Sequence, residues 1–349
     1  MMRKKWNFTI WTCIILILCL TGCRIKSEEP VSEQHQSSEE TDETPEYPLT
    51  IRVGYSTGQD DPRGVALDDF KKEVETATDG RILIEIHPSG ELGSDSELLA
   101  GMIDGSVDMT VSSAGNYALY ATKLGVSALP FLFDDFESAW KFIDSPQIQA
   151  LGSDLEVYNM HVLAYFDNGF RCVTTSEKIG PIETVEDMAG LNIRTPENQI
   201  VMETMAQLQA KPHSYPFAEL KAALADGSFD AQENPIPVIY NNKLYEVQKY
   251  LSVTNHSYDA MPLTIRQDIW VKLSTEDQEI IASAAEKAET ENRNLVSQQT
   301  EDYVKELEAV GMVINYPDLK PFREATAGVL DMFQAVYGEE LIGFVTNYQ

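Results

Sequence analysis

Beyond its N-terminal segment, the chain alternates stretches that favour strands with stretches that favour helices. Residues 49–55 alternate apolar and polar side chains, a pattern typical of a strand with one buried face. Asp61-Pro62 then begins a helix whose apolar residues recur every three or four positions, and Gly80 ends it. An apolar strand pattern follows at 82–86. Because this alternation continues, the sequence predicts an α/β fold with largely parallel sheets.

The remaining elements are predicted from the same periodicities. Helices are expected at 94–104, from Thr275 to about Ala309 and from Asp318 to Tyr337, and strands at 107–112, 161–166, 169–175, 191–195, 248–254, 262–267 and 312–316.

Two of these units resemble each other. Residues 98–108 and 220–230 each combine a short amphipathic helix, an Asp-Gly-Ser turn and the apolar-Asp start of a strand. Such a turn is common, so the similarity fits either chance or two related domains. In the second case the segments 111–113 and 231–234 face each other across a cleft, because ligands of open α/β sheets lie beyond the carboxyl ends of the strands.

Composition limits the function classes. The chain has 349 residues, of which 43% are hydrophobic, so it has room for two domains with proper cores. Lys and Arg number 26 against 56 Asp and Glu, a formal charge of −30. Such a surface repels nucleic acid, and we expect no nucleic-acid partner. A small anionic ligand stays possible, because a few buried arginines outweigh a distant, screened field.

The N-terminus predicts the compartment. A positive stretch at 3–5 precedes an apolar stretch at 8–20, which is too short for an ordinary membrane span and is typical of a signal peptide. It ends in Leu20-Thr21-Gly22-Cys23, which resembles a bacterial lipobox, so we expect residues 1–22 to be removed and Cys23 to carry a diacylglycerol anchor. An uncleaved anchor, or secretion with a chance cysteine, stays open. The acidic, apolar-poor segment 23–48 is expected to be a disordered tether.

No catalytic chemistry is predicted. Cys172 is the one cysteine left in the body of the chain, and none of the five histidines has metal-ligand spacing. The sequence has no nucleophile elbow, phosphate loop or dinucleotide fingerprint. We therefore expect no metal, no cofactor and no catalytic residue, although a pair of carboxylates as in glycosidases stays possible.

Four blocks in register resemble the DctP-type solute receptors of tripartite ATP-independent periplasmic (TRAP) transporters. The resemblance extends from about residue 49 to the C-terminus. The blocks are Asp167-Asn168-Gly169-Phe170-Arg171, residues 184–196 (Thr-Val-Glu-Asp-Met-Ala-Gly-Leu-Asn-Ile-Arg-Thr-Pro), residues 217–224 (Phe-Ala-Glu-Leu-Lys-Ala-Ala-Leu) and residues 230–235 (Asp-Ala-Gln-Glu-Asn-Pro).

The resemblance implies a two-lobed α/β fold of the type II periplasmic-binding-protein kind. Two domains with mainly parallel sheets flank a ligand cleft, the chain crosses between them more than once, and a long helix spans both. The pattern from Thr275 to Ala309 suits that helix. The implied domains are 49–170 with about 258–297, and 171–257 with about 298–349.

The resemblance also implies a function and partners. Receptors of this family deliver an organic acid to a membrane permease driven by an ion gradient, without converting it. We therefore expect a lipid-anchored, extracytoplasmic monomer whose partners are a small organic acid anion and the TRAP permease subunits. A ligand-sensing subunit for a membrane kinase and a lipid-anchored hydrolase stay open as alternatives.

The family's ligand-binding residues are carried over by position. Arg194 matches the arginine of the Leu-x-x-Arg-x-Pro block that clamps the ligand carboxylate, and a guanidinium can grip both carboxylate oxygens. Arg171 matches a second cleft arginine in the block that contains Asn168, or forms a structural ion pair. Asn234 matches an amide donor, and Phe217 matches an aromatic that packs on the ligand or in the core.

Departures from the family bear on the ligand. Sialate-type receptors have an Asn and a Glu where this chain has Ser56 and Ser113, whose hydroxyls can hydrogen-bond ligand oxygens. His213 and Tyr215 replace part of the usual segment before Phe217, where they reach the ligand or simply pack. Two arginines with several hydroxyls suit a sugar acid such as a uronate, or a C4-dicarboxylate.

Overall fold

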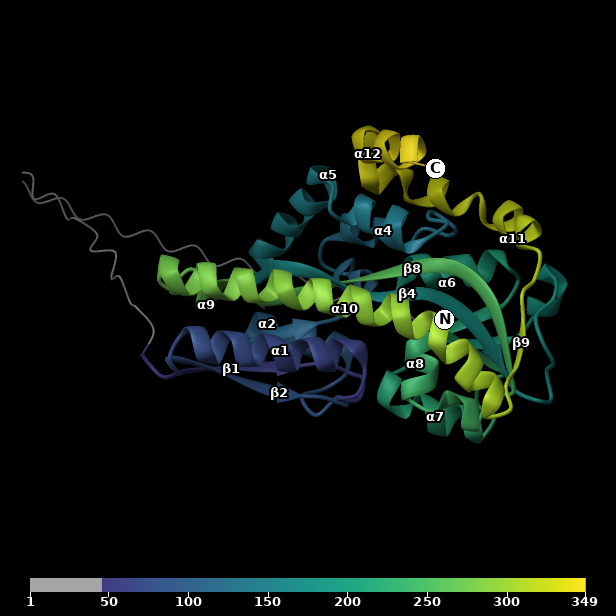
Figure 1. Ribbon diagram of the computed structural model, residues 1–349. Coiled ribbons are helices and arrows are strands. Elements are labelled where there is room, and N and C mark those ends of the chain that lie inside the picture. The colour runs from purple at the N-terminus through teal and green to yellow at the C-terminus, as the bar shows by residue number, and fades with distance from the viewer. Residues whose placement is uncertain (1–45, 349) are drawn as a thin grey trace, which may run out of the picture. The chain divides into compact units, whose positions relative to one another are not determined.

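A computed structural model describes residues 46–348 (Figure 1). The predicted signal peptide 1–22, the lipidation site Cys23 and the tether up to residue 45 lie outside the described residues. Tyr47 already contacts the folded unit, since its hydroxyl donates to Asp277 Oδ2 at 2.5 Å. Within residues 46–348, no helix is both long and apolar enough to span a membrane.

Nine strands form one mixed sheet. Their order is β2-β1-β3-β8-β4-β7-β5-β6, and β9 pairs with β8. Pairings within the two ends of the sheet are parallel, whereas the long strands β4 and β8 run antiparallel to each other and join those ends. The strands are β1 (Leu49–Gly54), β2 (Ile82–His87), β3 (Met109–Val111), β4 (Met160–Thr175), β5 (Asn192–Thr195), β6 (Lys211–Ser214), β7 (Ala231–Pro235), β8 (Tyr250–Arg266) and β9 (Val313–Asn315).

Helices cover this sheet. They are α1 (Pro62–Ala77), α2 (Asp95–Asp104), α3 (Ala114–Tyr117), α4 (Phe136–Ile143), α5 (Pro146–Gln149), α6 (Gln199–Gln207), α7 (Phe217–Ala225), α8 (Ile236–Asn241), α9 (Gln267–Trp270), α10 (Thr275–Ala309), α11 (Leu319–Thr326) and α12 (Val329–Tyr348).

The elements form two lobes joined by the long strands and by α10. The first lobe contains β1, β2 and β3, at one end of the sheet, with α1 and α2, and the second contains β5, β6 and β7, at the other end, with α7 and α8. Figure 1 shows α1 and α2 apart from α7 and α8, with α10 running past both groups. Helix α10 places Ile281 in the core of the first lobe and Leu307 in a core of the second. The predicted two-lobed α/β fold with a long helix across both lobes is therefore confirmed. The residue bounds of the two domains stay a prediction.

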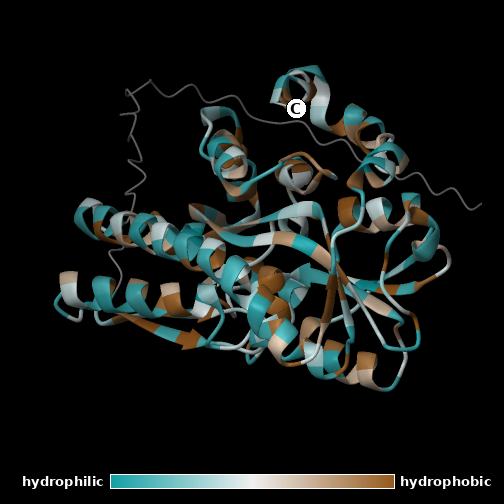
Figure 2. Cartoon of the chain, turned by 45° about the vertical axis from the view of Figure 1, so that its right-hand side comes forward, coloured by the Kyte–Doolittle hydropathy of each residue, from teal (hydrophilic) through white to brown (hydrophobic). Residues whose placement is uncertain are grey.

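Apolar side chains fill the space between the sheet and the helices. In the first lobe, Val53 and Ile84 of the strands pack against Phe70 of α1. In the second lobe, Ile193 of β5 packs with Met205 of α6. Figure 2 shows hydrophobic residues concentrated around the sheet, while the long helices carry mostly hydrophilic outer faces.

Four of the predicted strands are in fact two. The expected pair 161–166 and 169–175 is the single strand β4, and the pair 248–254 and 262–267 is the single strand β8. The polar pair Asp167-Asn168 between two predicted strands suggested a turn, but β4 continues through a register shift between Asp167 and Gly169. Two more shifts, between Val162 and Ala164 and between Arg171 and Val173, lie inside the predicted strands. Bulges let a strand continue while re-aiming polar side chains.

The helix predicted from Asp318 to Tyr337 is also wrong in its bounds. Helix α11 ends at Thr326, and α12 continues to Tyr348. Ala327 and Gly328 form the break, and α12 bends at Gly338, whose φ of 78° is left-handed. The expected helix crosses Gly328, where apolar periodicity continues, and it ends just before Gly338, where α12 bends but goes on.

Candidate functional site: a charged cleft between the lobes

A cleft between the lobes has an outer part of about 530 Å³ and an inner chamber of about 40 Å³. Polar and charged residues dominate its walls. Both parts are lined by Ser56, Asp95, Asn116, Arg194, Pro196 and Phe217. The inner chamber is also lined by Thr57, Arg63, Ser113, Asn168, Arg171, Asn234, Val238 and Asp259.

The chamber lies where parallel strands end. Ser56 and Ser113 follow β1 and β3 of the first lobe. Arg194 and Asn234 lie near the carboxyl ends of β5 and β7 of the second. Ser113 and Asn234 line the same chamber, so the segments after the two similar units meet at one cleft, as their positions in the sequence suggested.

Arg194 is a buried cation without a countercharge. Its side chain is only 3% exposed. Nε and Nη2 both donate to the main-chain oxygen of Tyr215, at 2.8 and 2.6 Å, and the guanidinium lies 5.8 Å from the centre of the Phe217 ring. Within residues 46–348, no carboxylate forms an ion pair with it. The end of the guanidinium that carries Nη1 and Nη2 thus keeps N–H groups for a ligand.

The pKa of Arg194 also reflects its lack of a paired carboxylate. Burial lowers the pKa of its guanidinium to about 10, although the charges of Glu233 and Asp95 oppose that shift. The group is still protonated at neutral pH. A bound carboxylate would supply the missing negative charge, so this position suits an anion.

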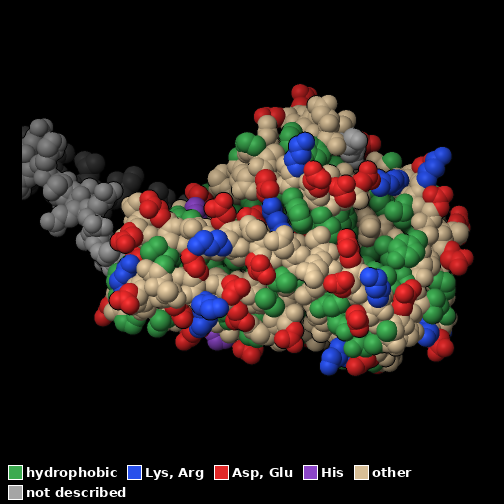
Figure 3. Space-filling model, viewed as in Figure 1, with side chains coloured by type: hydrophobic (Ala, Val, Ile, Leu, Met, Phe, Trp, Pro, Cys, Tyr) green, Lys and Arg blue, Asp and Glu red, His purple; other side chains and the backbone are tan. Residues whose placement is uncertain are grey.

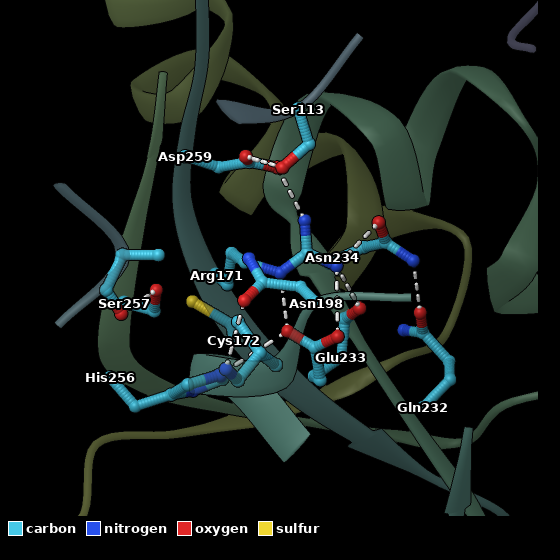
Figure 4. Close-up of polar contacts among 12 residues, drawn as sticks. Ser113, Arg171, Cys172, Asn198, Gln232, Glu233, Asn234, His256, Ser257 and Asp259 are labelled. Carbon is cyan, nitrogen blue, oxygen red and sulfur yellow. Dashed lines mark hydrogen bonds and ion pairs between the residues drawn. The ribbon is translucent and has the colours of Figure 1, made fainter. Parts of the chain in front are cut away.

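Arg171 has a different environment, because two carboxylates neutralise it (Figure 4). Nη1 donates to Asp259 Oδ2 at 2.6 Å, Nη2 donates to Glu233 Oε1 at 2.8 Å, and Nε donates to Glu233 Oε2. Nη2 also donates to Asn234 Oδ1 at 3.2 Å. Arg171 therefore lines the chamber as part of an ion-pair network, which favours the structural alternative over a second free cation.

This network fixes the charge states of its members. Burial opposes the charge on Arg171, but attraction to Glu233 and Asp259 raises its pKa above the ordinary value. Burial also favours the neutral form of Glu233, yet the charge of Arg171 and a hydrogen bond from His256 keep the Glu233 pKa below its usual value. Both partners stay ionised, and removing one would leave the other buried and unpaired.

A second set of hydrogen bonds forms one side of the chamber. Asn168 accepts from Arg63 Nη2 at 2.7 Å and donates to Asp259 Oδ2 at 2.8 Å. Ser113 Oγ donates to Asp259 Oδ1 at 2.5 Å, and Arg63 Nε donates to Asp61 at 2.9 Å. These bonds tie α1, the end of β3 and the two long strands together. Most polar atoms of Ser113 and Asn168 thus already form hydrogen bonds within the protein.

Eight of the nine predicted ligand-binding residues line the cleft. His213 is the exception, because it lies exposed on the edge strand β6. Tyr215 lines the outer part, but it offers Arg194 its main-chain oxygen, while its hydroxyl donates to Glu219 at 2.8 Å. The amide of Asn234 is occupied as well, since Nδ2 donates to Gln232 Oε1 at 2.5 Å.

The sequence interpretation missed Arg63, Asp95, Asn116 and Asp259. Arg63 could have been recognised in the sequence, because an arginine in the first turn of a helix is unfavourable with the helix dipole, and such a position suggests a role in binding or in an ion pair. Asp259 lies in a polar stretch that reads as a break between strands. Asp95 and Asn116 lie in the first turns of short helices and have no distinguishing pattern.

The two lobes touch at the mouth of the cleft. Ser96 Oγ on α2 donates to Glu197 Oε2 beyond β5 at 2.5 Å. Gly115 on α3 lies so close to Asn198 that an added Cβ would be 1.8 Å from Asn198 Nδ2. Glycine is therefore required at this approach, and the lobes are in contact around the cleft.

A buried carboxylate precedes one of the chamber residues in the chain. Asp167 precedes Asn168 on β4, and its side chain is 0% exposed. Trp140 Nε1 donates to its Oδ2 at 2.7 Å, while Oδ1 has no partner within the described residues. Burial raises the pKa of Asp167 to about 7, despite the opposing hydrogen bond from Trp140 and the charge of Arg293.

A cavity of about 480 Å³ lies elsewhere, between the segment 129–135 and the last two helices. Arg323 is the cation in its wall, and it donates to Asp134 at 2.7 Å and to the main-chain oxygen of Phe131 at 3.0 Å. Because that guanidinium is already paired, this cavity suits an anion less well than the cleft.

The exterior is acidic, and the described residues hold no metal-binding group. Figure 3 shows Asp and Glu side chains spread over the visible face, with fewer Lys and Arg among them. Among residues 46–348, no three His, Cys, Asp or Glu side chains are arranged to hold a metal ion. The buried charge of Arg194 is therefore positive in a protein whose net charge is negative.

Comparisons with known proteins identify the family of the chain. The family model of the bacterial extracellular solute-binding proteins, family 7 (DctP), matches residues 53–335. A 2,3-diketo-L-gulonate-binding periplasmic protein of Escherichia coli, YiaO, is 33% identical over 304 residues, which cover 86% of this chain and 92% of that protein.

Solved structures of TRAP periplasmic solute-binding proteins have the same fold. One from Polaromonas, bound to D-erythronate, is 33% identical with a TM-score of 0.82 and covers 85% of this chain and 98% of its own. The sugar acid binding protein DctPAm of Advenella mimigardefordensis, in complex with galactonate, is 30% identical with a TM-score of 0.83. The match covers 86% of this chain and 98% of DctPAm. The chain belongs to family 7 of the bacterial extracellular solute-binding proteins.

Proposed function

We propose that this receptor captures a small organic acid anion by its carboxylate and delivers it to a TRAP transporter permease. Arg194 carries the proposal. A buried guanidinium without a countercharge is costly unless an anion binds beside it. Two of its nitrogens are oriented by Tyr215, and the remaining N–H groups are free to grip both oxygens of one carboxylate.

The chemistry of the site and the ligands of the relatives both support a ligand class. The relatives bind 2,3-diketo-L-gulonate, D-erythronate and galactonate, all of them sugar acids. The cleft combines Arg194 with hydroxyl and amide groups, which suits such ligands. We therefore place a sugar acid first and a C4-dicarboxylate second.

Closure of the lobes would depend on the ligand. Arg194 comes from β5 of the second lobe, whereas Ser56 and Asp95 come from the first. A ligand that touches both lobes stabilises the closed state by its additional contacts there. The receptor would then release the acid unchanged to the permease.

Ligand capture is tested by a thermal-shift screen of the full chain against aldonates, uronates and C4-dicarboxylates. At 100 times its dissociation constant, a ligand should stabilise the protein by about 2.7 kcal/mol. Recovery of the acid unchanged, judged by NMR, is the expected result. A converted acid would contradict the receptor function, as would the failure of every acid to bind.

We propose further that Cys23 carries a lipid anchor that holds the monomeric receptor at the outer face of the membrane. Cys23→Ser should move the protein from the membrane fraction to the soluble fraction. Cys172→Ser is the matched control, because Cys172 is a buried free thiol and should leave the distribution unchanged. Membrane retention of the Cys23 variant would contradict the anchor.

Delivery is tested by reconstituting the receptor with its permease in vesicles and following uptake of labelled acid. Uptake should require both the receptor and an ion gradient. Binding of the acid without receptor-dependent uptake would contradict delivery while leaving ligand capture intact.

A further inference from the structure

The first lobe presents hydrogen-bond acceptors to the cleft, opposite the cation of the second. Asp95, in the first turn of α2, lines both parts of the cleft. Its Oδ1 accepts from Ser112 Oγ at 2.9 Å and from Ser56 Oγ at 3.2 Å. Within residues 46–348, no hydrogen bond occupies its Oδ2, so one carboxylate oxygen is free for a donor.

Asn116 adds a second acceptor, and its orientation is fixed by its neighbours. Ser112 Oγ gives its one proton to Asp95, so it must accept from Asn116 Nδ2, which lies 3.0 Å away. The amide oxygen Oδ1 is therefore the atom left over. It is buried without a partner in the described residues, although Asn116 is only 2% exposed and lines the chamber.

The acceptors and the cation are close enough to serve one ligand. Arg194 and Asp95 line both parts of the cleft, and the charge of Asp95 acts on the guanidinium, yet no ion pair joins the two side chains within the described residues. The cleft is thus positive at one end and accepts hydrogen bonds at the other. The buried oxygen of Asn116 is costly without a donor, and the half-buried carboxylate of Asp95 loses water when a ligand fills the cleft, so the ligand should bring donors to both.

We infer that Asp95 and Asn116 determine specificity, so that the receptor selects hydroxylated monocarboxylates and rejects dicarboxylates of the same length. Hydroxyl groups donate to both residues while the single carboxylate lies on Arg194. A second carboxylate would meet the negative charge of Asp95 and would have no proton to donate. This inference rests on the proposed function and narrows its ligand class.

The test uses two matched pairs of acids that differ at one terminal carbon. D-galactonate and galactarate share their hydroxyl stereochemistry, as do D-erythronate and meso-tartrate, and each second acid replaces the terminal CH₂OH by a carboxylate. Calorimetry on the full chain should show the monocarboxylate of a pair binding at least about tenfold more tightly than its dicarboxylate.

Asp95→Asn removes the charge and keeps the shape. The variant should bind the monocarboxylate more weakly and the dicarboxylate more tightly, so that the ratio of the two dissociation constants falls by about tenfold or more. Asp154→Asn is the control, because it changes the net charge equally at an exposed position outside the cleft, and it should leave the preference unchanged.

The outcomes separate the two claims. If the acids bind but the dicarboxylate binds as tightly as its partner, or if Asp95→Asn leaves the preference unchanged, the inference is overturned and the proposed function stands. If none of the four acids nor any acid of the screen binds, the proposed function fails and the inference fails with it.

Discussion

Replacing Arg194 by Met separates binding from stability. Met keeps the aliphatic packing of the side chain and removes the charge. Because Arg194 has no carboxylate partner within the described residues, the substitution removes a buried, uncompensated cation. Its two hydrogen bonds to Tyr215 are lost at the same time. The relieved desolvation offsets those bonds, so we expect the free energy of unfolding without ligand to change by less than about 1 kcal/mol.

The effect on affinity should be much larger. A bidentate grip makes two charge-assisted hydrogen bonds, each contributing about 1.5–3 kcal/mol. Losing both should raise the dissociation constant at least about 100-fold, since each 1.4 kcal/mol is about a factor of ten. Arg194→Lys keeps a charge but not the planar fork, and should lose about tenfold.

The assay combines isothermal calorimetry with urea unfolding of the full chain, using the acid that binds most tightly in the screen. Weak binding together with unchanged stability is the result expected for a residue that serves the ligand. The reasoning would be refuted if the Met variant bound the acid within about threefold of wild type. It would equally be refuted if the variant lost several kcal/mol of stability.

Three further predictions concern residues around the cleft. Arg171→Met should destabilise the ligand-free protein by about 3–5 kcal/mol in urea unfolding, because it leaves the buried carboxylates of Glu233 and Asp259 without their cation. A change below about 1 kcal/mol would contradict the ion-pair network. Because the folded-state pKa of Asp167 is raised to about 7, its burial costs stability as pH rises from about 4 to about 7. The free energy of unfolding of Asp167→Asn, relative to that of wild type, should therefore rise by up to about 3 kcal/mol between about pH 5 and pH 8. A difference that does not change with pH would contradict this prediction. Gly115→Ala should weaken acid binding by keeping Asn198 from α3, whereas Gly343→Ala, with nothing within 4 Å, should not; equal affinities would argue against the close approach.

Much of the fold could be predicted because it follows local periodicity. The helix from Thr275 to Ala309 has the bounds that its sequence suggested, beginning at a serine cap and continuing without glycine or proline. The strands β4 and β8 were divided wrongly for a physical reason. Their centres contain polar residues that serve the chamber, and local patterns do not distinguish such residues from a turn.

The site was only partly predictable. Arg194 stands out in sequence because a family block surrounds it, and the structure places it in the cleft. The balance of charge was not visible, because Arg171 and its partners Glu233 and Asp259 come from three different strands. Which arginine is free and which is neutralised depends on tertiary contacts alone.

A crystal structure of the full chain with D-galactonate tests the central claim most directly. We expect the ligand carboxylate to lie within hydrogen-bond distance of Arg194 Nη1 and Nη2, with ligand hydroxyls facing Asp95 and Asn116. Electron density for the acid in the cavity beside Arg323, or in the cleft with its carboxylate away from Arg194, would contradict the account.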